Sequence, residues 1–368
     1  MNFRNMLIGS VATLAAIPAA RAADAIVMAE PEPVEYVRVC DAYGSGFFYI
    51  PGTETCLRIS GYVRYQIGAT NDDGLAAGDT PNYYGYANGW NKTTRARINF
   101  DARSDTEWGT LRAFVRYQAS WGTPNDGPAR ADQAWLSLGG LRMGYSESLW
   151  ADSVFDLSVS GSHSDGGLWY GDQQRHFVQY NFGGGTGFFG SVSLEDDALS
   201  GDGYMPDIVG LAGFQQRWGG LWARVGYDES YGILGDDGFG VSAGLQINAG
   251  ESGSFRLIGY YADGDHDYGT GSSYAGISGG NGNAEWSVLG SYYHQFTPSF
   301  GGSIGAQYFS DYYAGGTDIS TGLDGYIAEA SLVWEPVDNL EIRTEAVYEK
   351  VDGLDGTVSG FLWFKRSF

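Results

Sequence analysis

The chain has 368 residues, with 44 acidic residues against 21 lysines and arginines, and a formal charge of −23. This balance argues against nucleic acid as a partner, because phosphate binding needs a basic face. Glycine contributes 58 residues, and Tyr, Phe and Trp contribute 26, 19 and 11. So much glycine argues against a helical enzyme, and so many aromatic residues argue against disorder. The composition therefore indicates an all-β protein with an acidic surface.

The N-terminus has the pattern of a cleaved signal peptide. Arg4 supplies the positive charge, residues 6–20 form an uncharged apolar run, and Ala20-Arg21-Ala22 matches a small-x-small cleavage site. A membrane anchor is the alternative, but the run is shorter than the roughly 20 residues that cross a bilayer. We expect residues 1–22 to be removed, which makes the mature chain more acidic because two arginines are lost. No later apolar run is long enough for a transmembrane helix, which leaves a soluble exported protein or a membrane β-barrel.

Strict alternation of side chains favours the barrel. Within residues 57–69, Ile59 and Val63 share one face, and Arg58 and Arg64 share the other. The same alternation occurs over residues 94–103 and 111–120. In a soluble sandwich the apolar face would pack on a second sheet. A charged opposite face in successive strands suits a water-filled lumen better.

Strands and connections follow the same plan along the chain. We predict strands near 57–69, 93–104, 109–121, 131–139, 141–147, 175–182, 187–196, 208–217, 221–230, 238–249, 253–263, 284–295, 300–310, 323–334, 340–350 and 357–368. Short turns alternate with loops near 70–92, 122–130, 148–174, 197–207, 264–283 and 311–322, plus short members near 231–237 and 351–356. The prediction is a transmembrane antiparallel β-barrel of about 16 strands over residues 57–368, with short periplasmic turns and long extracellular loops.

The C-terminal residue is a candidate assembly signal. Phe368 shares a face with Phe364, Leu362 and Val358. Outer-membrane barrels end on a strand whose terminal aromatic residue is read by the barrel-assembly machinery, although an ordinary strand can also end in Phe. Arg366 stands where an apolar residue is usual.

Two segments carry a family resemblance. Residues 33–65 (PVEYVRVCDAYGSGFFYIPGTETCLRISGYVRY) and the ending GFLWFKRSF resemble the alphaproteobacterial, rhizobial-type general porins of the outer membrane, as does the Ala22-Ala23-Asp24-Ala25 junction. The resemblance implies a sixteen-stranded homotrimer among lipopolysaccharide and outer-membrane lipids. It also implies a channel for passive diffusion of small hydrophilic solutes and ions, with the third loop folded into the lumen.

Cys40 and Cys56 are the only cysteines. Two cysteines in an oxidising periplasm usually pair, which in the chain-entropy model stabilises by roughly 3 kcal/mol. Metal binding is the alternative, but two cysteines without a nearby histidine make a poor zinc site. We expect a disulfide in a periplasmic segment, residues 23–56. Whether this segment enters the lumen stays open.

Arginines are concentrated on the predicted inward face of the first strands. Arginine facing lipid near the bilayer centre costs a few kcal/mol, which places them inward. Structural ion pairs with Asp101 and Asp105 are the alternative, but local acids are too few to pair nearly all of them. The set is Arg58, Arg64, Arg95, Arg97, Arg103, Arg112, Arg116 and Arg142.

The long segment 148–174 is the candidate constriction loop. It carries Asp152, Asp156, Asp165 and Asp172, with Glu147 at its base. Its apolar residues, such as Leu149, Trp150, Leu168 and Trp169, favour insertion into the barrel over an exposed acidic loop. The predicted opposing wall is Arg64, Arg95, Arg97, Arg112, Arg116 and Arg142. Facing charges of opposite sign would sort ions, and the surplus of acid predicts weak cation selectivity.

Other motifs give weaker signals. Residues 263–267 have the alternating acids of a calcium loop but lack its later glycine and acid, so we interpret them as a solvated loop and expect no metal and no cofactor. Ser160, Ser162 and His163 invite a lipid hydrolase interpretation, but proximity in sequence is not a catalytic triad. We expect no enzyme. A closed barrel acting as an adhesin or anchor is the remaining alternative, and conductance would separate it from a porin.

Overall fold

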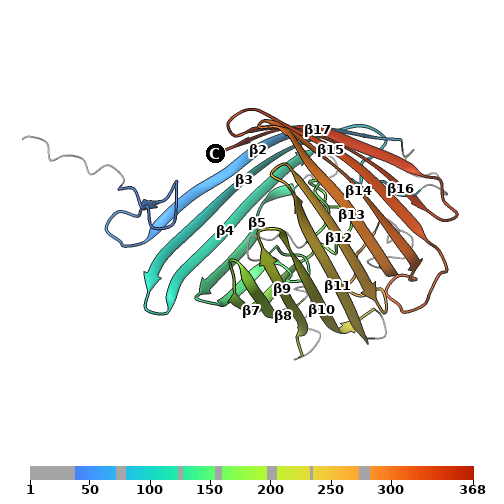
Figure 1. The fold of residues 1–368 in the computed structure, drawn as a ribbon, viewed down its shortest axis with the longest axis horizontal. Helices are drawn as coiled ribbons and strands as arrows, with labels where there is room; N and C mark the ends of the chain where they lie inside the picture. The colour runs from blue at the N-terminus through green and yellow to red at the C-terminus, as the bar shows by residue number, and fades with distance from the viewer. Residues whose placement is uncertain are drawn as a thin grey trace, which may run out of the picture. The chain divides into compact units, whose positions relative to one another are not determined.

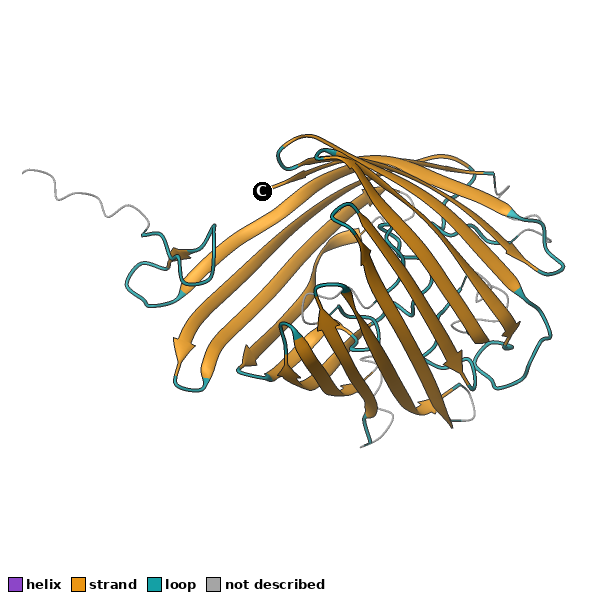
Figure 2. Cartoon of the chain, in the orientation of Figure 1, coloured by secondary structure: helices purple, strands orange, loops and turns teal. Residues whose placement is uncertain are grey.

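The computed structural model describes residues 38–71, 80–122, 127–153, 160–196, 205–232, 235–272 and 282–368 (Figure 1). The predicted signal peptide and residues 23–37 lie outside these ranges. All regular structure within them is β-strand (Figure 2). Among these residues no helix is long and apolar enough to cross a membrane.

Sixteen strands of the described chain form a closed antiparallel barrel. Each pairs with the next in sequence, and β17 pairs with β2 to close the sheet. The strands are β2 (Cys56–Thr70), β3 (Gly89–Thr106), β4 (Gly109–Gly122), β5 (Gly127–Leu138), β6 (Leu141–Glu147), β7 (Gln174–Gly183), β8 (Gly187–Asp196), β9 (Asp207–Gln216), β10 (Gly219–Tyr231), β11 (Asp236–Ala249), β12 (Gly253–Ala262), β13 (Ala284–Thr297), β14 (Phe300–Tyr312), β15 (Gly325–Val337), β16 (Leu340–Val351) and β17 (Thr357–Ser367). The predicted strands are confirmed, and no boundary differs by more than four residues.

The two faces of the wall have the polarity that the alternation predicts. Ile59, Val63 and Leu362 are exposed on the outside, whereas polar side chains such as Gln179 and Glu345 are buried inside. Aromatic residues are exposed near both rims, including Trp108 in a short turn and Trp90 beside a long loop. An apolar band flanked by aromatic residues is typical of a membrane barrel.

The closing seam holds the C-terminus against the first barrel strand. Leu362 pairs with Ile67 and Phe364 with Tyr65. Phe368 exchanges two backbone hydrogen bonds of 3.0 Å with Gly61, and its side chain is exposed. The terminal aromatic residue therefore lies on the outer face at the rim of short turns.

The part of the N-terminal segment that the structure describes forms a small lobe. Its disulfide joins Cys40 and Cys56, as predicted, and the two-residue strand β1 (Phe48–Tyr49) pairs with β2. Phe47 is buried, with the guanidinium carbons of Arg58 and Arg103 at 4.8 and 5.1 Å from its ring. Because both arginines are on the inward face, Phe47 contacts the lumen side of the rim of short turns.

Candidate pore constriction

The described residues 148–153 and 160–173 lie between β6 and β7, and they contact strands on the other side of the lumen. Arg224 of β10 donates hydrogen bonds to the carbonyls of Trp150 and Asp152, the second at 2.6 Å. Arg256 of β12 donates to the carbonyls of Ser160, Gly161 and Ser162 at 3.0, 2.7 and 2.9 Å. Both arginines are buried. Two arginines absent from the predicted wall set therefore hold the constriction loop by its backbone.

His163 attaches the same loop to two further strands. Its Nδ1 lies 2.7 Å from Oγ of Ser291 on β13, and its Nε2 lies 3.1 Å from Oγ of Ser254 on β12. Desolvation and the positive charge of Arg256 lower the pKa of His163 to about 4. The imidazole is therefore neutral at neutral pH. Since both ring nitrogens contact wall serines, this histidine serves as a loop anchor, while the Ser162 hydroxyl contacts Ser164 instead.

Apolar loop residues pack as the sequence predicts. Leu149, Trp150 and Leu168 are buried in the largest apolar cluster of the described chain. The indole of Trp150 donates to the carbonyl of Gly269 at 2.8 Å, which joins the constriction loop to the loop after β12. Val154, Phe155 and Leu157, which lie in the same segment, fall outside the described residues.

The inward arginines share carboxylates more extensively than the sequence suggested. Asp101 accepts hydrogen bonds from Arg103 at 2.7 Å and Arg112 at 2.8 Å, and Arg58 lies 3.4 Å away. Asp132 is 3.5 Å from Arg116 and 3.8 Å from Arg97. One carboxylate therefore pairs with up to three arginines, so the few local acids can pair more of the inward arginines than the sequence predicts.

Aromatic rings hold the arginines of this sector in place. The Arg142 and Arg112 guanidiniums lie 4.4 and 4.7 Å from the Trp135 ring. Arg97 lies 5.1 Å from Tyr62 and donates a hydrogen bond to Gln118 at 2.9 Å. Arg95 donates to the Ser120 hydroxyl at 3.0 Å. Stacking and hydrogen bonding leave these side chains little conformational freedom.

Two acids of the constriction loop meet arginines of the predicted wall. Asp152 is 2.7 Å from Arg142, and Asp165 is 3.7 Å from Arg64. Glu147, at the base of the loop, is 4.0 Å from Arg116. Asp172 lines a cavity at the end of the barrel with long loops. Asp156 lies outside the described residues.

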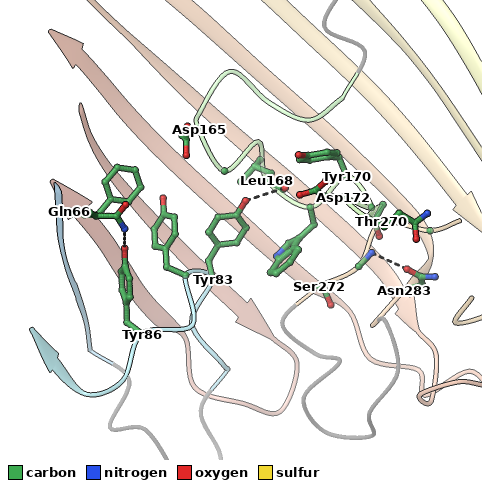
Figure 3. A pocket seen from close by; sticks show the side chains of 18 of the residues that line it. Gln66, Tyr83, Tyr86, Asp165, Leu168, Tyr170, Asp172, Thr270, Ser272 and Asn283 are labelled. Carbon is green, nitrogen blue, oxygen red and sulfur yellow. Dashed lines mark hydrogen bonds between the residues drawn. The ribbon is translucent and has the colours of Figure 1, made fainter. Parts of the chain in front are cut away.

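Several of the predicted site residues contribute to the linings of two cavities in the lumen. The outer cavity, about 610 Å³, lies on the side of the long loops, and Arg64 is part of its lining. Asp165 and Asp172 line it as well (Figure 3). The inner cavity, about 440 Å³, is on the side of the short turns and is lined in part by Arg112, Arg116, Arg142 and Asp152. Arg95 and Arg97 lie along neither lining.

A second loop enters the lumen, and the sequence analysis did not predict it. Within residues 80–88, here called the L1 hairpin, Tyr83 donates a hydrogen bond to the carbonyl of Leu168 at 3.2 Å (Figure 3). Tyr86 accepts one from Gln66 at 2.6 Å, and a Cβ at Gly68 would collide with its ring. The sequence signal for this inserted loop is Gly68, an inward glycine on an arginine-rich strand, because such a glycine leaves room for a side chain from another segment.

Comparison with known proteins gives the family. Residues 24–360 match the model of the Porin subfamily. The chain is 32% identical to porin Omp2b of Brucella suis in an alignment 400 positions long that covers all of both chains. It is 39% identical to Omp2b of Brucella neotomae over 62% of this chain and 66% of that one.

Solved structures show the same fold. The outer-membrane channel DcaP of Acinetobacter baumannii superposes with a TM-score of 0.67 at 17% identity, covering 87% of this chain and 99% of the channel. A mutant porin of Rh. blastica gives a TM-score of 0.51 at 15% identity, covering 85% and 100%. With a full-length match to alphaproteobacterial porins on a closed sixteen-stranded barrel, the chain belongs to the Porin subfamily and forms a channel in the outer membrane.

Proposed function

We propose that the channel passes small hydrophilic solutes and ions by passive diffusion, and that residues 148–173 narrow it against the arginine wall. The observation that carries the proposal is the double attachment of this loop. Arg224 and Arg256 hold its backbone on one side, while Asp152 faces Arg142 at 2.7 Å on the other. A loop fixed at both sides of a lumen limits what passes beside it.

The charge arrangement supports weak cation selectivity. Loop acids share the aperture with arginines, and the acidic chain adds negative charge at the mouth, where salt screens it over about 8 Å. Replacing Asp152 and Asp172 with Asn should shift the reversal potential in a salt gradient toward anions. Replacing Arg97 and Arg116 with Ser should shift it toward cations and raise the conductance.

A matched control separates the constriction from overall charge. Asp237 is exposed and lies at the start of β11, away from both cavities. Asp237→Asn should leave the reversal potential where it is. If the paired substitutions of Asp152 with Asp172 and of Arg97 with Arg116 also leave the reversal potential unchanged, residues 148–173 do not form the constriction.

The oligomeric state of the channel is a further proposal, supported by the family to which the chain belongs. We propose a homotrimer whose contacts include outward positions with small side chains, such as Gly61, Ala96 and Ala113, since closed cyclic symmetry is the usual form of such assemblies. A monomer in native mass spectrometry from mild detergent would contradict this.

The remaining proposals concern export and insertion. Residues 1–22 are removed as a signal peptide, Phe368 is recognised by the barrel-assembly machinery, and lipopolysaccharide surrounds the outer rim. N-terminal sequencing tests the cleavage site. Deleting Phe368 should reduce the amount of folded protein in the outer membrane. We assign no catalytic role to any residue, and esterase activity of the purified protein that His163→Ala abolished would contradict this.

A further inference from the structure

A continuous row of aromatic rings runs along one side of the outer cavity. Ring centroids are 4.9 Å apart for Trp169 and Tyr83, 5.0 Å for Tyr83 and Tyr84, and 5.1 Å for Tyr84 and Phe361. Trp363 continues the row at 4.7 Å from Phe361, and Tyr86 stacks on Tyr84 at 5.4 Å. These six residues, here called the aromatic row, come from the L1 hairpin, the constriction loop and β17, and all line the cavity.

The aromatic row is built in and is not loose filling. Tyr84 donates a hydrogen bond to Glu345 at 3.1 Å, and the indole of Trp169 donates to Glu349 at 3.1 Å. A Cβ at Gly166 would lie 2.6 Å from the Tyr83 hydroxyl, so this tyrosine packs directly on the loop backbone. The interior of a porin barrel is ordinarily polar. Tyr86, Phe361 and Trp363 are buried and support the row from behind. Tyr83, Tyr84 and Trp169 line the cavity and keep part of their surface exposed, so they can offer apolar surface to a ligand.

The rest of the cavity lining is polar. Asp165 and Asp172 supply carboxylates, and Gln66 and Asn283 supply amides (Figure 3). Gln173 supplies a further amide. Arg64 lies 3.7 Å from Asp165 and 4.4 Å from the Trp363 ring. The site thus combines aromatic faces with groups that both donate and accept hydrogen bonds.

We propose that the outer cavity is a binding subsite for neutral saccharides entering the channel. A pyranose ring has an apolar C–H face that packs on an aromatic ring, and a rim of hydroxyl groups that bond to carboxylates and amides. The cavity volume of about 610 Å³ is in the range of sites that hold small ligands. The proposal rests on the proposed diffusion channel, because the saccharide has to continue past the constriction loop.

An organic cation is the competing ligand, and the ring geometry disfavours it. A cage for a quaternary ammonium presents several ring faces to one point. Here the rings meet edge to face, with interplanar angles of 72° for Trp169 and Tyr83 and 80° for Tyr83 and Tyr84. The partly exposed rings therefore do not close around one point, and they leave apolar surface beside the polar groups of the cavity, which suits a neutral sugar.

The test is the block of ion current by a sugar in planar bilayers. Maltotriose should reduce the wild-type current with saturation. In Trp169→Ala and Tyr84→Ala, the half-saturating concentration should rise by about tenfold or more, because each loses one stacking platform. A polyethylene glycol of similar mass is the size control and should not saturate. Choline chloride is the cation probe and should not compete with maltotriose.

Two variants keep the result interpretable. Tyr83→Phe keeps the ring and loses only the hydroxyl, so maltotriose should bind within about twofold of wild type. Tyr293→Ala removes a tyrosine that stacks beside His163 outside the aromatic row, and should also leave binding within that range. Salt conductance of each variant reports the open channel independently of sugar binding.

Three results would overturn the proposal. Equal block by maltotriose and the glycol would show exclusion by size alone. Competition by choline would assign the cavity to cations, and unchanged maltotriose binding in both alanine variants would move the sugar elsewhere. If salt passes but the charge substitutions above leave selectivity unchanged, the constriction proposal fails while the saccharide subsite still stands.

Discussion

Replacing Arg256 with Met should release the constriction loop. Met retains much of the buried chain volume and removes the guanidinium. In the wild type one nitrogen, Nη1, lies 3.0, 2.7 and 2.9 Å from the carbonyls of Ser160, Gly161 and Ser162. Since Nη1 has two hydrogens, these contacts amount to about two hydrogen bonds from a charged donor, or about 3 kcal/mol in total. A loss of that size changes the ratio of inserted to released loop by about a hundredfold.

Single-channel recording measures this release. Arg256→Met should show a higher mean conductance and more current noise than wild type, and Arg256→Lys should recover part of the wild-type behaviour. Arg217→Met is the matched control, because Arg217 is exposed in the short turn between β9 and β10. If Arg256→Met and the double variant with Arg224→Met both conduct like wild type, these arginines do not hold the loop.

Three further predictions concern charge, pH and the disulfide. Asp101→Asn leaves Arg103, Arg112 and Arg58 without their shared carboxylate, so the reversal potential should move toward anions; a shift toward cations would contradict the pairing. Desolvation inside the barrel and the nearby Asp132 carboxylate raise the pKa of Asp172. Asp172 should therefore take up its proton at a pH above the usual aspartate range, and cation preference should drop as the pH falls through that region. Asp172→Asn should remove this drop from the pH titration of selectivity; an identical titration in the variant would refute the assignment. Cys40→Ser should lower the free energy of unfolding of the lobe at residues 38–56 by roughly 3 kcal/mol in the chain-entropy model. Proteolysis of the lobe should become faster while the conductance stays unchanged. Equal proteolysis rates would mean that the disulfide does not stabilise the lobe.

The wall was predictable because each strand has to satisfy two environments at once. Ile59 and Val63 contact lipid while Arg58 and Arg64 contact the lumen, and a period of two is the only pattern that separates them. The folding of the loop between β6 and β7 into the barrel was predictable because Leu149 and Trp150 need an apolar partner. Periodicity gives the face of a residue, and apolar content gives burial.

What the sequence did not reveal is which inward groups meet across the lumen. Arg224 and Arg256 occupy inward positions in the two-residue alternation of their strands, as the other inward arginines do. The neighbouring sequence therefore does not distinguish an arginine that binds the loop from one that faces the pore. The sequence predicts only an ordinary long loop at the L1 hairpin, because the inward position of Tyr86 depends on the gap that Gly68 leaves on another strand. Contacts between residues distant in sequence can be predicted only from the closed barrel, because closure sets both the register of each strand and the depth of each side chain in the lumen.

The placement of the anchors also bears on why selectivity should be weak. Arg224 and Arg256 bind backbone carbonyls of the constriction loop, so no carboxylate neutralises them through those contacts. The loop acid Asp152 therefore has positive charge on two sides: Arg142 lies 2.7 Å from its carboxylate, and Arg224 binds its backbone carbonyl. A carboxylate between two arginines produces steep local fields but contributes little net potential along the pore axis, since the contributions oppose one another. Such a field orients a dipolar solute at the aperture and discriminates weakly between anions and cations. A neutral, hydroxyl-rich solute is the kind of molecule that this arrangement passes with the smallest electrostatic barrier.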